Sequence, residues 1–395
     1  MPTLRHCESA DDLHGTVKIG YEVHNGDAAA SWVVFVAGVA APRGMWDRQV
    51  AALAPTTGAV TVDNRGIGDS DVPAGGYSTE AMAADVLTVV ADVVPGGAAV
   101  HVVGHSLGAM ISCKVAGVLA AEKRLASLTL LSGSLGGWFN MIPPITAKLF
   151  RTLPKLATAS TAHRRASADL DCHYTDAYVA EHRDDLMDEY VNLSNSQRRF
   201  DEGRQRAKTG EDGHLAAVFK HRVTAADLAA VRDSGARVVV AHGRHDFVAG
   251  VSAGETLWRA FKDAGCAVAD YHVLHGAHFI QREREIEING LVNAQVAGGA
   301  IDAPPVAAEA PPNFGCYAVL FFLACLAVLL VLAFSTDALP KPRSLQEIPE
   351  FLASDANATW AALWNQTDEA DELLSAFIFR GAPRAGAAAL RLATA

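Results

Sequence analysis

The sequence lacks an excess of basic residues. Its 33 lysines and arginines face 44 aspartates and glutamates, which gives a formal charge of -11 at pH 7. A chain with that balance offers no extended positive surface for a phosphate backbone. We therefore expect no nucleic acid among its partners.

Cysteine is scarce and scattered. The chain has 6 cysteines, none in a Cys-x-x-Cys pair, and two of them, Cys316 and Cys325, lie within one apolar run. This spacing argues against a disulfide framework and against a zinc site, and it fits a reducing compartment. We expect neither a metal nor a cofactor.

No export signal is visible at the start of the chain. Residues 1–15 mix basic and acidic side chains, among them Arg5, Glu8 and Asp11, without an apolar stretch of the length that a secretory signal needs. We expect no cleavable leader.

One long apolar run lies far along the chain. Residues 316–334, CYAVLFFLACLAVLLVLAF, include no charge and no proline. As a helix this run would be about 28 Å long, close to the roughly 30 Å hydrocarbon core of a bilayer. It is predicted to be a single transmembrane helix, which makes a membrane an expected partner. A buried core helix is the alternative, although core helices rarely run this long without a polar residue.

Short apolar runs alternate with helical patterns from about residue 15 to residue 297. This alternation is typical of an α/β domain, in which helices cover both faces of a mostly parallel sheet. The expected strands are 17–23, 32–36, 60–62, 99–103, 127–131, 237–241 and 267–274. The expected helices are 45–53, 79–93, 108–121, 254–264 and 279–296.

One interval breaks the alternation. Residues 136–223 have helical patterning, many charges and the pair Pro143-Pro144, but no convincing strand. So long a stretch cannot be a plain loop in a compact domain, and it is predicted to be a helical insert. Beyond the domain 1–297, residues 298–315 are rich in Ala, Pro and Gly and are expected to be a linker, and the tail 335–395 receives no fold.

The sequence Gly104-His105-Ser106-Leu107-Gly108 stands between an expected strand and an expected helix. A serine at so sharp a turn is held in a strained backbone conformation that exposes its hydroxyl. The two flanking glycines are needed because strand and helix pass so close there that a Cβ would collide. The Gly-x-Ser-x-Gly pattern is weak alone, but the strand before it and the helix after it are the ones that this turn requires.

From about residue 17 to residue 296 the chain resembles the α/β-hydrolase family. The resemblance rests on the serine turn and on two further segments. The turn from Asp63 to Ser70, DNRGIGDS, is similar to a structural turn of the family. The pair Ala37-Gly38 stands where the family usually has His-Gly before an oxyanion-hole residue. The resemblance implies a mostly parallel eight-stranded sheet with a helical cap insert, and it implies that the backbone N–H groups of Val39 and Leu107 bind an oxyanion.

A serine hydroxyl needs an imidazole to take its proton, and that imidazole needs a carboxylate to fix its tautomer. In the order that the resemblance implies, Asp246 follows an expected strand as the acid and His278 follows the next as the base. His275 competes with His278, and Asp246 could instead be a turn or helix-cap residue. We expect the histidines 101, 105, 242 and 245 to be packing or hydrogen-bonding residues.

A serine nucleophile implies an acyl-enzyme hydrolysed by water, which disfavours epoxide and haloalkane substrates. We expect a serine hydrolase acting on a carboxylic ester, while thioester, amide and some carbon–carbon cleavages stay open. The apolar run 316–334 favours a lipid-like ester such as a monoacylglycerol, met at the membrane surface. The rival hypothesis is an inactive binding or scaffold module, which Ala37 in place of the usual histidine keeps open.

The orientation of the expected span is contested by two signals. Lys341 and Arg343 follow the span and would keep the tail in the cytosol. Asn357 and Asn365 each begin a glycosylation sequon, which would have a use only in a lumenal tail. A large domain without an export signal stays where it was made, so we expect a cytosolic hydrolase domain and a single-pass anchor.

Overall fold

A computed structural model describes residues 3–26, 29–137, 147–193 and 204–299. All of them belong to one compact unit, Met1–Glu309. This unit holds an eight-stranded sheet in the order β1-β2-β4-β3-β5-β6-β7-β8. The strands are β1(Thr3–Asp11), β2(Gly15–His24), β3(Ser31–Val36), β4(Thr57–Val62), β5(Ala99–His105), β6(Leu125–Leu131), β7(Arg237–Gly243) and β8(Val268–Leu274).

The sheet is parallel except at one edge. β1 pairs antiparallel with β2 and β2 pairs antiparallel with β4, while every pair from β4 to β8 is parallel. The parallel strands therefore all have their carboxyl ends along the same border of the sheet, which we call its carboxyl edge. Side chains from separate loops can converge there. The mostly parallel eight-stranded sheet expected from the sequence is confirmed.

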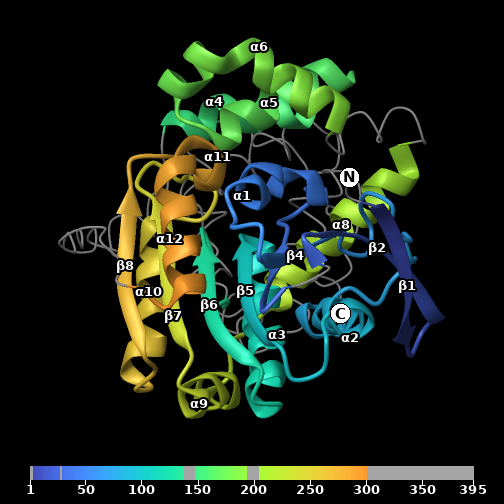
Figure 1. Cartoon of the computed structure of the whole chain (residues 1–395). Coiled ribbons are helices and arrows are strands. Elements are labelled where there is room, and N and C mark those ends of the chain that lie inside the picture. The colour runs from blue at the N-terminus through green and yellow to red at the C-terminus, as the bar shows by residue number, and fades with distance from the viewer. Residues whose placement is uncertain (1–2, 27–28, 138–146, 194–203, 300–395) are drawn as a thin grey trace, which may run out of the picture. The chain divides into compact units, whose positions relative to one another are not determined.

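The central strands are buried on both faces, which explains why their sequences read as continuous apolar runs. Val34 and Val36 of β3 lie in one core cluster, whereas Val33 and Phe35 lie in the other. Helices cover both faces in Figure 1. The covering elements are η2(Arg43–Trp46), α1(Asp47–Ala51), α2(Thr79–Val93), α3(Leu107–Ala121), α9(Ala225–Ser234), α10(Val251–Asp263), α11(Ile280–Glu283) and α12(Glu285–Ala297).

One strand of the sheet, β1, and one of its covering helices, α9, were not predicted. β1 carries few apolar side chains and borders the sheet, so it lacks the alternation by which a half-buried strand is recognised. α9 is short and begins with a capping box between Thr224 and Asp227. The expected helix 279–296 is divided at Arg284, whose φ of -122° and ψ of 47° are not helical.

The insert between β6 and β7 is helical. Its described helices are α4(Ala147–Thr158), α5(Ala162–His173), α6(Asp176–Leu193) and α8(Arg204–Lys220). Its two ends meet, because Gly136 and Arg222 form an isolated bridge and Val223 N donates to Leu135 O over 3.0 Å. Figure 1 shows α4, α5 and α6 beyond the ends to which the strand arrows point, so this insert caps the carboxyl edge of the sheet.

The predicted span 316–334 and the tail 335–395 lie outside the described residues, as does nearly all of the linker 298–315. Among the residues that the structure describes, no helix is long and apolar enough to cross a bilayer.

Candidate active site

Ser106 occupies a tight turn between β5 and α3. Its backbone has φ 55° and ψ -119°, a left-handed conformation that a residue with a Cβ rarely adopts. The turn is held by a hydrogen bond of 2.8 Å from Ser106 N to Leu131 O on the neighbouring strand. Such strain persists only where the surrounding structure overdetermines it, and it leaves the side chain half-buried at the helix N-terminus.

The glycines flanking Ser106 have the role that the sequence predicts. A Cβ on Gly104 would lie 2.3 Å from Gly108 O and 2.3 Å from Ser112 Oγ. A Cβ on Gly108 would lie 2.0 Å from Val36 O, on the neighbouring strand β3. Strand and helix thus cross at a separation that only glycine permits.

The segment after β3 passes directly beside the serine. A Cβ on Gly38 would lie 3.2 Å from Ser106 Cβ and 3.2 Å from His105 O. Within the described part of the chain, the N–H groups of Val39 and Leu107 donate no hydrogen bond, and Leu107 opens α3. Two free amide donors beside a helix N-terminus form a suitable place for a negatively charged oxygen.

His278 and Asp246 lie in line with Ser106. His278 Nε2 is 3.0 Å from Ser106 Oγ, and His278 Nδ1 is 2.7 Å from Asp246 Oδ2. A carboxylate only accepts hydrogen bonds, so Nδ1 carries the proton and Nε2 is free to accept from the serine hydroxyl. The structure brings together these three side chains, which lie 32 and 172 positions apart in the sequence.

Asp246 is buried and firmly held. Its Oδ1 accepts the N–H groups of Val248 and Ala249, both at 2.9 Å, and its Oδ2 lies 3.2 Å from His242 Nε2. Burial alone would raise the pKa of Asp246, but the electrostatic attraction of the nearby His278 side chain and hydrogen bonds from His242 and His278 outweigh burial and hold that pKa below its ordinary value. The acid therefore stays ionised at neutral pH.

His275 does not reach the serine turn. Its Nε2 lies 3.2 Å from Nε2 of His245 in a solvent-exposed pair, with the ring centroids 4.6 Å apart. Geometry thus favours His278 over its neighbour, because a base must lie within hydrogen-bond reach of the proton that it takes.

Comparison with known proteins agrees with this fold. The model of a family described as alpha/beta hydrolase fold matches residues 31–285. The chain belongs to the α/β-hydrolase fold family. The sequence resemblance to that family is therefore confirmed.

Solved structures of α/β-hydrolase proteins superpose on this chain. A hydrolase from Pseudomonas aeruginosa PA01 gives a TM-score of 0.56 at 20% identity, over 74% of this chain and 98% of the other. The enol-lactonase from Burkholderia xenovorans LB400 gives 0.55 at 20% identity, over 74% and 100%. An esterase from Exiguobacterium antarcticum gives 0.55 at 16% identity, over 74% and 100%. At these identities the likeness shows the fold alone.

A curated relative is similar to a smaller part of this α/β-hydrolase chain. The "Probable oxidoreductase EphD" of Mycobacterium tuberculosis is 32% identical over 135 residues, which are 34% of this chain and 22% of that relative. The chain thus spans about a fifth of the length of the curated relatives that it matches.

The cap of this α/β-hydrolase domain contacts the loop that carries His278. Phe279 N donates to the carbonyl of His173 over 3.0 Å, and the rings of these two residues lie 4.4 Å apart. Glu283 accepts the N–H of Ala277 at 2.9 Å and the hydroxyl of the cap residue Thr175. The position of the base is therefore tied to the position of the cap.

Three buried histidines around the site were expected only to pack or to hydrogen-bond, or were not singled out. His105 Nε2 donates to the carbonyl of His278 over 2.9 Å, and burial lowers the pKa of His105 to about 3. His242 contacts Asp246, as described above, and His214 of α8 reaches the segment after β3. The contact of His242 is local, because Asp246 lies four positions further along the chain. The partners of His214 lie 174 and 149 positions away, so no local pattern in the sequence reveals them.

The DNRGIGDS turn is structural, as the resemblance implies. Arg65 forms a bidentate pair with Asp85, at 2.6 and 2.8 Å, and a further bond of 2.6 Å to Asp11. Asn64 Nδ2 donates to Ala37 O over 2.8 Å. The turn thereby fixes the segment that passes beside Ser106.

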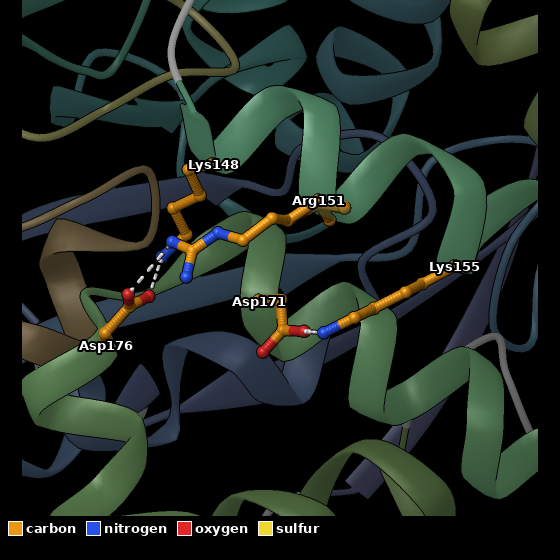
Figure 2. Close-up of a pocket in the computed structure, with 6 residues that line it drawn as sticks. Lys148, Arg151, Lys155, Asp171 and Asp176 are labelled. Atoms are coloured by element: carbon orange, nitrogen blue, oxygen red, sulfur yellow. Dashed lines mark hydrogen bonds and ion pairs between the residues drawn. The ribbon is translucent and has the colours of Figure 1, made fainter.

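A charged hollow on the cap is lined by residues other than those of the serine site. Figure 2 shows Lys148, Arg151 and Lys155 of α4 facing Asp171 and Asp176. Lys148 pairs with Asp176 at 2.9 Å and Lys155 with Asp171 at 2.6 Å, so the opposite charges largely compensate each other. These exposed pairs fasten α4 to its neighbours and contribute little stability each. Among the described residues, no group of three or more His, Cys, Asp or Glu side chains could hold a metal ion.

Proposed function

We propose that this protein is a serine hydrolase that cleaves carboxylic esters through an acyl-enzyme on Ser106. The observation that carries the proposal is the line of contacts from Ser106 Oγ to His278 Nε2 at 3.0 Å and from His278 Nδ1 to Asp246 Oδ2 at 2.7 Å. This arrangement supplies a nucleophile, a base and an acid that orients the base.

The reaction follows from these contacts. His278 Nε2 takes the hydroxyl proton while Ser106 Oγ attacks the ester carbonyl carbon, and the N–H groups of Val39 and Leu107 bind the oxyanion that forms. When the oxyanion collapses, His278 gives its proton to the departing alcohol and the acyl group stays on Ser106. His278 then deprotonates a water molecule, which attacks the acyl carbon. Ser106 recovers its proton as the carboxylic acid leaves.

The rival hypothesis of an inactive binding module rests on Ala37. The observed contacts give more support to the enzyme, because Asn64 holds the Ala37 carbonyl at 2.8 Å and Gly38 lies against Ser106. The segment is thus held in place without a histidine at position 37. Since the nucleophile is serine, thioesters, amides and some carbon–carbon bonds are the other substrates to try.

A lipid-like ester, such as a monoacylglycerol, is the substrate class that we propose first. The support is the apolar run 316–334, which we propose as a single membrane span with the hydrolase domain in the cytosol. A chain that alkaline carbonate extracts from membranes would contradict this anchor. Residues 138–146, which belong to the expected insert 136–223, are outside the described residues.

Covalent labelling with a fluorophosphonate tests the mechanism. We expect the full chain to be labelled at Ser106, and Ser106→Ala to fold normally without labelling. A series of p-nitrophenyl esters of increasing length then measures kcat/KM for each acyl chain. Folded wild-type protein that neither reacts with the probe nor hydrolyses any ester would overturn the proposal, and a preference for acetate over long chains would contradict the lipid substrate.

A further inference from the structure

His214 lies in α8 of the cap, yet both of its ring nitrogens bind the two segments that flank the serine turn. Its Nδ1 is 3.1 Å from Ala40 N, and its Nε2 is 2.7 Å from the carbonyl of Arg65. An N–H can only donate and a carbonyl can only accept, so Nδ1 is the acceptor and Nε2 carries the proton. These two partners together fix the neutral tautomer.

The environment of His214 preserves that neutral form. The side chain is fully buried, and burial lowers its pKa to about 4 against the opposing effects of the Arg65 carbonyl and Glu211. Protonation would place a second N–H opposite the N–H of Ala40, so the contact to Ala40 requires the neutral ring. At neutral pH both hydrogen bonds are therefore present.

The residue that His214 holds is strained and adjacent to an oxyanion donor. Ala40 has a φ of 53°, in the left-handed region that residues with a Cβ rarely occupy. It directly follows Val39, whose N–H faces no acceptor among the described residues. A hydrogen bond to Ala40 N therefore stabilises the turn that orients the Val39 amide.

The docking of α8 makes this contact specific. A Cβ on Gly210 would lie 2.1 Å from Gly66 O, and one on Gly213 would lie 2.5 Å from the ring of Tyr77. The two glycines, at positions i-4 and i-1 from His214, let the helix backbone approach the DNRGIGDS turn closely. The imidazole can then reach across to the segment after β3.

We propose that His214 is a positioning residue for the oxyanion hole, by which the cap holds the Val39 amide toward Ser106. This inference rests on the proposed serine hydrolase function. It assigns the cap a part in stabilising the transition state in addition to any part in forming the substrate pocket. His214 itself does not touch the reacting atoms.

Two amide substitutions separate the two hydrogen bonds of His214. The Oδ1 of His214→Asn lies near the position of Nδ1 and can still accept from the N–H of Ala40, but the carbonyl of Arg65 loses its donor. The side-chain NH2 of His214→Gln reaches the position of Nε2 and can still donate to the carbonyl of Arg65, but the N–H of Ala40 loses its acceptor. Both variants lose one buried hydrogen bond, so they form a matched pair.

The test measures kcat and KM of the full chain with p-nitrophenyl butyrate. We expect His214→Gln to lower kcat about 10- to 100-fold with KM changed less than about threefold, because misplacing an oxyanion donor weakens the transition state selectively. We expect His214→Asn to keep kcat within about threefold of the wild type. His221→Asn is the control, since His221 is also buried at the end of α8 but pairs with Thr79, at 3.0 Å from its Nδ1.

Equal kcat values for His214→Asn, His214→Gln and His221→Asn would overturn the inference, as would a larger loss in His214→Asn than in His214→Gln. Hydrogen exchange of the peptide containing Val39 and Ala40 provides a readout that needs no turnover. Faster exchange in His214→Gln but not in His214→Asn supports the contact, and unchanged exchange in both contradicts it. An inactive wild-type protein would overturn the proposed function and the catalytic part of the inference, while the exchange result would still decide whether His214 holds the segment.

Discussion

At the scale of single residues, two neighbouring histidines allow a direct test of the base. His278→Asn removes the imidazole that contacts Ser106 Oγ at 3.0 Å, so we expect kcat to fall at least about 10³-fold. His275 pairs only with His245 at the surface, so His275→Asn should keep kcat within about twofold. Steady-state kinetics on a p-nitrophenyl ester measures both. A large loss in His275→Asn with an active His278→Asn would reverse the assignment.

The sequence predicted Ser106, His278 and Asp246, each of which follows a strand of the parallel sheet. Ser106 follows β5, Asp246 follows β7 and His278 follows β8, and parallel strands end at one edge. The pattern around Ser106 predicted the nucleophile, and the order implied by the family resemblance then placed the acid and the base. His214 was not predicted, because its partners Ala40 and Arg65 lie 174 and 149 positions away and only the docking of α8 brings them together.

At the scale of elements, two glycines of α3 should respond in opposite ways to alanine. Gly108→Ala would place a Cβ 2.0 Å from Val36 O, so we expect a loss of about 1–3 kcal/mol or more in the free energy of unfolding. Gly117→Ala meets nothing closer than Asp227 Oδ1 at 3.7 Å, so the better helix propensity should add about 0.5–1 kcal/mol. Urea unfolding followed by circular dichroism measures both variants.

The contrast between these variants isolates the crossing of strand and helix from the general effect of glycine in a helix. Equal stability of Gly108→Ala and the wild type would show that β3 and α3 can move apart without cost. Ester hydrolysis by Gly108→Ala should fall as well, because the displaced helix carries Leu107, a proposed oxyanion donor.

Helices and strands could be predicted where burial leaves a periodic pattern of apolar residues in the sequence. They could not be predicted where local hydrogen bonding determines the structure. α2 was expected at 79–93 and runs from Thr79 to Val93, because its apolar residues recur with a helical period. β1 was missed because an edge strand needs few apolar residues. The division of the last helix at Arg284 was missed because nothing in the local sequence there resembles a helix end.

At the scale of the whole domain, buried neutral histidines should make stability depend on pH. Burial lowers the pKa of His101, His214 and His221 to about 4 and that of His105 to about 3. In the unfolded chain a histidine has a pKa near 6.5. Between about pH 6.5 and pH 4 the unfolded state therefore binds more protons, so stability is lost as the pH falls through this window and regained as it rises.

One substitution isolates a single contribution to this effect. His101 lies on β5, where its Nδ1 is 2.8 Å from Ser127 Oγ, and burial is the cause of its lowered pKa. His101→Gln cannot take up that proton, so its destabilisation relative to the wild type should be about 2 kcal/mol smaller at pH 5 than at pH 7.5. His163 is exposed, so His163→Gln is the control. Its destabilisation relative to the wild type should be the same at the two pH values. Urea midpoints at both pH values measure the difference. A constant difference for His101→Gln would mean that the pKa of His101 is the same in the folded domain as in the unfolded chain.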